Sequence, residues 1–254
     1  MNALIVALIA FACILGGSFC GMFLRNYLPE HHLSEESKDI VKLGTGMIAT
    51  LGALVLGLLI ASAKGNFDTV NGSLRDTGSK IIVLDRTLAQ YGPEAREVRD
   101  MLRGSITAAI REYWPEDAKS SAAVKGLNST DKMYDLQMRL LDLSPKNEAQ
   151  RALKSRVLQV GWEIDQTRWL IAEQRGLTSL PVTFLVIIIC WFTIIFTSFG
   201  LFAPRNATVI VVLFVCAVSV ACSLFLISEL DRPYGGVVKV SSAPLRNALI
   251  IIGR

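Results

Sequence analysis

Four long stretches of the chain contain no charged side chain, and this feature limits the possible folds more than any other. Each stretch is near or above the roughly 20 apolar residues that a helix needs to cross a bilayer. Lipid offers no water to backbone N–H and C=O groups, so a helix must satisfy these groups internally. The sequence therefore predicts an all-α integral membrane protein with four transmembrane helices. The stretches cover residues 1–24, 43–63, 176–204 and 206–228.

A polar segment rich in helix-forming residues separates the second stretch from the third. Basic and acidic residues are nearly balanced there, which indicates a solvated surface rather than a nucleic-acid-binding patch. No nucleic acid is therefore expected as a partner. We expect transmembrane helices 1 and 2 in residues 1–64, a helical domain in 65–175, transmembrane helices 3 and 4 in 176–228, and a tail in 229–254.

The distribution of basic residues predicts the orientation in the membrane. Four spans place both termini and the middle domain on one side, and the two short loops on the other. Positive charge gathers on the cytoplasmic side of membrane proteins. We therefore expect a multi-pass protein of the bacterial inner membrane whose termini, middle domain and tail are cytoplasmic. Of the 26 Lys and Arg residues, only Arg25, Lys38, Lys42 and Arg205 fall on the other side.

Apolar residues after the second span recur at helical spacing, which predicts that its helix continues without a break to Tyr91–Gly92. Further helices are expected over 93–114, over 133–141 and from an N-cap at Ser144 followed by Pro145. Trp162 and Trp169 on the last of these are interpreted as packing anchors against a neighbouring helix or subunit. The continuing stripe consists of Phe67, Val70, Leu74, Ile81, Leu84 and Leu88.

The tail contains the apolar run "APLRNALIII", which is too short to span a bilayer. Two interpretations remain equally favoured. The run docks on the cytoplasmic helices of its own or a neighbouring subunit, or it associates loosely with the membrane surface.

The second span carries small residues at every fourth position, an arrangement that lets another backbone approach closely. The first span offers a matching pair of glycines as a partner surface. Apolar side chains give little driving force for association in lipid, so close backbone packing has to supply it. We interpret the small residues as a packing seam within or between subunits. The seam consists of Ala49, Ala53, Gly57, Ala61 and Gly65, with Gly17 and Gly21 on the first span.

The opposite face of the second span is bulky and apolar, and then polar at its cytoplasmic end. It meets lipid or the other spans, or else several copies surround an axis and it lines a pore. A hydrophobic constriction in such a pore gates by dewetting. The candidate pore-lining residues are Ile48, Leu51, Val55, Leu59, Ser62 and Asn66.

Several function classes lack the residues they need. No Asp, Glu, Lys, Arg or His lies within a span, which argues against a proton-coupled transporter. No motif for a nucleophile, a phosphate loop or a metalloprotease occurs, so an enzyme is not expected. His31 and His32 are interpreted as part of a solvated loop rather than a metal site. All five cysteines lie in apolar stretches without metal-ligand spacing, and we expect no metal and no cofactor.

Several short motifs occur in a characteristic order along the chain. They are "LLIASAKGNFDTVNGSLRDTGSKI" out of the second span, "YGPEAREVRDMLRGSI", "GLTSLP" before the third span and "DRPYGG" after the fourth. In these motifs and their order, the chain resembles the bacterial bestrophin-like membrane family, whose members are distant relatives of bestrophin channels. Bestrophins proper are pentameric, anion-selective channels whose second span lines the pore, and the resemblance implies this architecture with a pore. It does not extend to calcium gating or chloride selectivity, because Glu229 and Asp231 are too few for a calcium site and the second span has no Phe before Phe67 to form an aromatic neck.

The leading hypothesis is therefore a homo-oligomeric ion channel, with a pentamer favoured, in which inorganic ions pass a constriction on the second span and membrane lipid surrounds the spans. The alternative is a non-conducting membrane sensor or scaffold whose cytoplasmic helices bind a partner. A membrane enzyme ranks third, because no candidate nucleophile, base or metal cluster is present.

Overall fold

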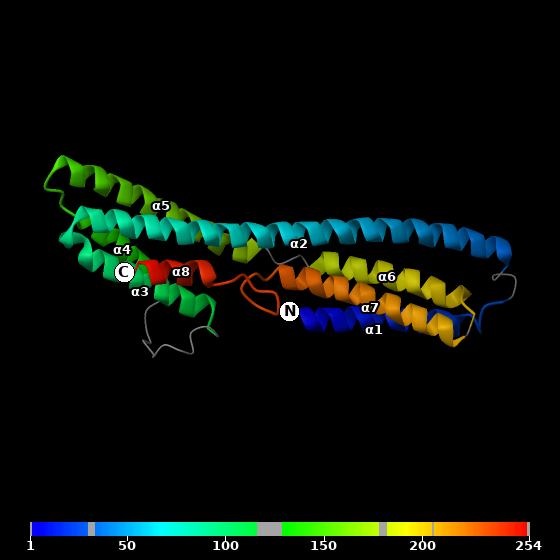
Figure 1. Cartoon of the computed structure of the whole chain (residues 1–254). Coiled ribbons are helices and arrows are strands. Elements are labelled where there is room, and N and C mark those ends of the chain that lie inside the picture. Colours follow the sequence, from blue (N-terminus) through cyan, green and yellow to red (C-terminus); the bar gives the residue numbers. More distant parts are fainter. Residues whose placement is uncertain (1, 30–33, 116–128, 178–181, 205, 253–254) are drawn as a thin grey trace. The chain divides into compact units, whose positions relative to one another are not determined.

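The computed structural model describes residues 2–29, 34–115, 129–177, 182–204 and 206–252, and within these ranges every regular element is a helix. Four helices are long and apolar enough to cross a membrane, which confirms the predicted all-α fold with four spans (Figure 1). The elements are α1 (Ala3–Leu24), α2 (Glu35–Tyr91), the 3-10 helix η2 (Pro93–Ala95), α3 (Arg96–Tyr113), α4 (Ser129–Asp142), α5 (Glu148–Leu177), α6 (Val182–Phe202), α7 (Ala207–Leu230) and α8 (Ala243–Ile251).

The chain divides into two compact units. The span unit comprises Met1–Phe67 and Thr178–Val238, and the helical unit comprises Asp68–Leu177 and Lys239–Arg254. Helix α2 belongs to both, because it runs unbroken from Glu35 to Tyr91 as the stripe after the second span predicted. The tail, expected as one segment, is divided after Val238.

In the span unit, α1 packs against α6 and α7 (Figure 1). Its glycines contact α6: a Cβ at Gly17 would lie 2.9 Å from the carbonyl oxygen of Thr193, and one at Gly21 would overlap that of Thr197. Gly200 of α6 fits against α1 in the same way, at the backbone of Ser18. The close packing expected of Gly17 and Gly21 is present, but the expected partner was wrong. It is α6 rather than the second span, because α6 offers its own small surface.

We predict that a large side chain at Gly21 destabilises this contact. Gly21→Leu forces α1 and α6 apart and should lower the free energy of unfolding by about 1–3 kcal/mol. Thermal unfolding of the purified protein in detergent measures the loss. Gly16→Leu is the matched control on the same helix, since a Cβ at Gly16 meets nothing within 4 Å. Equal loss in both variants would contradict the close-packing role.

The helical unit has its own core, built where the stripe of α2 meets α3, α4 and α5. Leu84 and Leu88 of α2, Leu102 of α3 and Leu140 of α4 are almost completely buried. The apolar periodicity of the sequence predicted this buried side of α2, and Val70, Leu74 and Ile81 confirm it. Burying such side chains stabilises the unit by roughly 1.5–3 kcal/mol each.

Two helix starts differ from the sequence prediction. The predicted cap at Ser144 was wrong, because α5 starts at Glu148 and the side-chain oxygen of Asn147 accepts a hydrogen bond from the Gln150 N–H at 2.8 Å. Pro145 therefore lies in the preceding turn. Helix α4 begins at Ser129, earlier than expected.

The end of the tail docks on the helical unit of its own chain. The indole N–H of Trp114 donates to the carbonyl of Val240 at 2.8 Å in a buried site. A Cβ at Gly78 would lie 3.0 Å from the carbonyl oxygen of Pro244, so the start of α8 lies directly on the α2 backbone. Leu245 and Ala248 are buried. Of the two interpretations of "APLRNALIII", the structure shows docking on the helical unit of the same chain.

One buried ion pair joins α2 to α3. Asp85 is 2% exposed and receives two hydrogen bonds from Arg99, from Nε at 2.7 Å and from Nη2 at 2.9 Å. The paired geometry matches the two carboxylate oxygens to the guanidinium fork. The hydrogen bond with Asp85 also raises the pKa of the Arg99 guanidinium.

We predict that Asp85→Asn lowers the free energy of unfolding by about 3–5 kcal/mol, because it leaves the Arg99 charge half-buried without its partner. Chemical denaturation measures this change. Glu97→Gln serves as the control, since Glu97 pairs with Arg139 at 3.4 Å with both side chains mostly exposed. It should cost about 1 kcal/mol or less. Similar costs for the two variants would show that Asp85 is not a structural anchor.

Candidate pore-lining helix

One side of the membrane-spanning part of α2 packs against the core of the span unit. Ile48, Val55 and Leu59 contact the buried cluster formed by α1, α6 and α7, and Ala63 belongs to that cluster. Gly52 is also buried, and a Cβ there would lie 3.5 Å from the Phe192 ring. This contact side holds α2 to its own subunit.

The other side of the same segment carries an exposed row of large apolar side chains. Met47, Leu51, Leu54 and Leu58 are between 54% and 70% exposed. Their spacings of four, three and four residues place them on one side of a helix. We call these four residues the apolar strip. Within the described part of the chain nothing covers it, so it meets lipid or other copies of the chain.

The structure divides the six candidate pore residues between these two sides. Leu51, Ser62 and Asn66 are exposed. Ile48, Val55 and Leu59 are half-buried against the core of their own span unit. The six therefore do not form one open face.

Sequence reasoning did not single out Met47, Leu54 and Leu58, whose side chains are 69% to 70% exposed. Their regular spacing was visible in the sequence. The sequence does not show which side of α2 packs against α6 and α7. That contact determines which row of α2 side chains stays exposed.

The small residues of the seam lie mostly on the open side as well. Ala53, Gly57, Ala61 and Gly65 are exposed, and a Cβ at Gly57 or Gly65 would meet nothing within 4 Å. Ala49 alone packs against the core of the span unit. Four of these five positions therefore leave a narrow surface on α2 that no other part of the described chain fills.

The electrostatic character of this segment is simple. From Leu43 to Phe67 the only ionisable side chain is that of Lys64. Its ammonium group lies 5.6 Å from the centre of the Phe67 ring, which is within reach of a cation–π contact. The segment thus combines an uncharged apolar length with one cation near its polar end.

At the end of the fourth span, a buried carboxylate binds the backbone of the segment that follows. Glu229 is 4% exposed, and its Oε2 accepts backbone N–H groups from Val237 at 2.5 Å and Val238 at 3.2 Å. Gly236 has a φ of 81°, a conformation that favours glycine, and a Cβ there would overlap the carboxylate. Glu229 therefore folds the chain after α7 back onto the helix end.

Among the described residues, no group of three or more His, Cys, Asp or Glu side chains is arranged to hold a metal ion. His31 and His32 lie outside the described residues. All five cysteines are free and exposed on the spans. Between Leu43 and Phe67 the site offers apolar shape, a few polar groups and the single cation of Lys64.

These features define a class before any comparison. The chain is a four-span helical membrane protein in which the second span continues unbroken into a helical unit inserted before the third. The family model described as Bestrophin-like domain matches residues 12–245. The chain belongs to the bestrophin-like family. No curated protein sequence matches it significantly.

Solved structures show the same fold. Two are variants of a bacterial bestrophin homologue from Klebsiella pneumoniae. The variant with an isoleucine-to-threonine mutation has 13% sequence identity and a TM-score of 0.67, and the match covers 97% of this chain and 99% of that chain. The variant with an aspartate-to-alanine mutation has 12% identity, a TM-score of 0.61 and the same coverage. The predicted resemblance is confirmed.

We predict that Glu229→Ala loosens the segment after α7. Removal of the carboxylate leaves two backbone N–H groups without their charged acceptor and should cost about 1.5–3 kcal/mol. Thermal unfolding measures the cost, and limited proteolysis between Asp231 and Val238 reports the local opening. Glu36→Gln, at an exposed position, should change stability by less than about 0.5 kcal/mol. Unchanged proteolysis in Glu229→Ala would contradict the clamp.

Proposed function

We propose that the protein is the subunit of a homo-oligomeric ion channel, a pentamer in the favoured arrangement, whose pore is lined by α2. The observation that carries this proposal is the apolar strip, which lies open opposite the side by which α2 packs on its own subunit. Membership of the bestrophin-like family supports it. The solved relatives are bacterial bestrophin homologues, and the likeness to them supports the same fold.

In a ring of subunits, α2 would contact its own span unit on one side and a neighbouring subunit on another, and a third side would face the central axis. The side with Val55 and Leu59 faces its own span unit. The side with Ala53 and Gly57 is slim enough for the helix of a neighbour to approach closely. The apolar strip, opposite the first side, then faces the axis together with Ser62. This arrangement revises the pore-lining set toward Met47, Leu54 and Leu58 while keeping Leu51, Ser62 and Asn66.

The proposed pore has a hydrophobic constriction and a polar end. Rings of Leu51, Leu54 and Leu58 narrow it without any charge, and such a constriction gates by dewetting. Ser62 and Asn66 then provide hydroxyl and amide groups. Lys64 is the one ionisable residue in this part of the helix. A ring of lysines attracts anions, so we propose that anions pass more readily than cations.

The helical unit offers a second surface for assembly. Trp162 is 69% exposed and Trp169 is 60% exposed, and both lie on α5. Large aromatic residues are enriched where proteins meet partners. Because the described part of the chain leaves both open, we propose that neighbouring subunits cover them. The excess of Lys and Arg on this side of the spans supports a cytoplasmic helical unit and an inner-membrane location.

The same tryptophans support a second candidate function. A non-conducting sensor or scaffold would use Trp162 and Trp169 to bind another protein, and its apolar strip would face lipid. The two candidates differ in whether water reaches the strip.

We predict that water-soluble thiol reagents reach the apolar strip from the pore. In a cysteine-free background, Leu51→Cys, Leu54→Cys and Leu58→Cys should react and should lower chloride flux from liposomes by roughly tenfold or more, because the attached group fills a narrow constriction. Val215→Cys on α7 is the lipid-facing control and should show no change. Val215 is 56% exposed.

The outcomes separate the hypotheses. Reaction at positions 55 and 59 in place of 54 and 58 would restore the face expected from the sequence. Protection of every position, together with no ion flux, would reject the channel and leave the scaffold. A monomer or dimer in detergent would reject the ring.

A further inference from the structure

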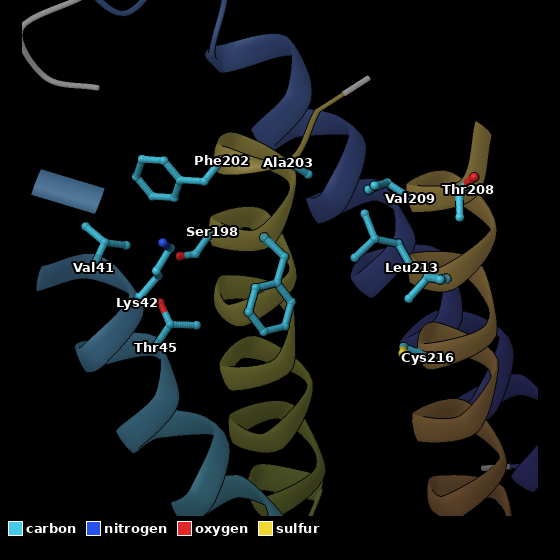
Figure 2. Close-up of a pocket in the computed structure, with 12 residues that line it drawn as sticks. Val41, Lys42, Thr45, Ser198, Phe202, Ala203, Thr208, Val209, Leu213 and Cys216 are labelled. Carbon is cyan, nitrogen blue, oxygen red and sulfur yellow. The ribbon is translucent and has the colours of Figure 1, made fainter. Parts of the chain in front are cut away.

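A cavity of about 490 Å³ opens between α2, α6 and α7, within the span unit. Figure 2 shows its lining residues converging from these three helices. The walls are almost entirely apolar. They include Val41 and Thr45 of α2, Phe199 and Phe202 of α6, and Val209 and Val212 of α7.

The cavity lies at one end of the contact between α2 and the neighbouring helices. Further along α2, Gly52 lies against the Phe192 ring. Thr45 is itself only 6% exposed, and with Val41 it lines the α2 wall of the cavity, opposite α6 and α7. The opening is a wedge between helices of a single chain.

Water is a poor occupant of this wedge. A bound water needs two to four polar partners, and an apolar cavity does not supply them. A helix of a second copy is about 10–12 Å wide with its side chains, and a cavity of about 490 Å³ is too small to hold even a full turn of it. An acyl chain is narrow and apolar, and the bilayer surrounds the spans. The volume also lies within the roughly 300–1,000 Å³ of ligand pockets.

One cation lines the cavity and a second contacts a lining residue. Lys42 lines the cavity, and Arg25, outside the lining, donates from Nη1 to the carbonyl of the lining residue Ala203 at 2.7 Å. Lys42 also faces Asp39 at 3.5 Å, with both side chains mostly exposed. Such an exposed pair contributes little because water screens it, so a phosphate can compete for the ammonium group.

The start of α7 contributes a second attraction for an anion. Thr208 in its first turn lines the cavity, and the helix begins just before it. N–H groups at a helix start, together with the helix dipole, favour negative charge. Charge at the rim and an apolar interior match the two ends of a phospholipid.

We propose that this cavity binds one acyl chain of an anionic membrane phospholipid, with the phosphate held at Lys42 and Arg25. The site lies within one subunit and depends on the membrane location alone, not on ion conduction. Lipid occupancy and ion flux are therefore independent readouts, and loss of one leaves the other interpretable.

The test is native mass spectrometry of the full-length protein in detergent, titrated with phosphatidylglycerol and separately with phosphatidylcholine. The unmodified protein should bind about one phosphatidylglycerol per subunit more tightly than phosphatidylcholine. Val212→Trp fills the cavity and should weaken phosphatidylglycerol binding by roughly tenfold. Val215→Trp is the matched control, because both valines are exposed on α7, at 54% and 56%, and only Val212 lines the cavity.

A second pair of variants separates headgroup from chain. Lys42→Gln should reduce the preference for phosphatidylglycerol over phosphatidylcholine by roughly fivefold while the acyl site remains. Cys216→Phe fills the same cavity from another lining position, so its result stands if Val212→Trp misfolds.

Three results would overturn the proposal. One is unchanged phosphatidylglycerol binding in both filled variants. Another is an equal loss in Val215→Trp. The third is a change in subunit number with unchanged lipid binding, which would identify a second copy as the occupant.

Discussion

Helices in a bilayer gain little from burying apolar side chains, because lipid tails are as apolar as leucine. The span unit depends on what remains, which is close backbone contact. Gly17 and Gly21 of α1 and Gly200 of α6 remove the side chains that would keep these two helices apart. The neighbouring threonines satisfy their own hydroxyls on carbonyls of α6, at 2.7 Å for both Thr193 and Thr197. One tightly packed helix pair therefore provides the surface on which α7 and α2 are placed.

Helix α2 is attached less closely, and the pore role that we propose for it depends on that. Apart from Gly52 against Phe192, it meets the span core through aliphatic side chains such as Val55 and Leu59. Its slim side and its apolar strip stay open. The slim side of α2 has no helix packed against it in the described chain, so it favours association with another copy. In the proposed ring, the arrangement of the subunits would then determine which α2 side chains face the axis.

The sequence predicted what depends on one helix at a time. Hydropathy located the four spans, and the spacing of Leu74, Ile81 and Leu88 located the buried side of α2 beyond the membrane. It failed where the answer depended on a second element. The partner of Gly17 and Gly21 is α6, because Gly200 supplies the matching recess, and no periodicity within α1 carries that information. The row Met47, Leu54 and Leu58 was missed for the same reason, since exposure is set by where α6 and α7 lie.

Two open surfaces of the span unit differ in a way that assigns them different occupants. The apolar strip is exposed and has no charged residue before Lys64, so identical copies could meet along it without repulsion between like charges, as the proposed ring requires. The wedge at Val41 and Thr45 is concave, narrow and bordered by cations, so it fits a flexible chain with an anionic head. A lipid in that wedge would lie against α2 next to Thr45, at one end of the contact between α2 and its neighbouring helices. In the proposed channel, such a lipid would help to fix the position of the helix that we propose lines the axis.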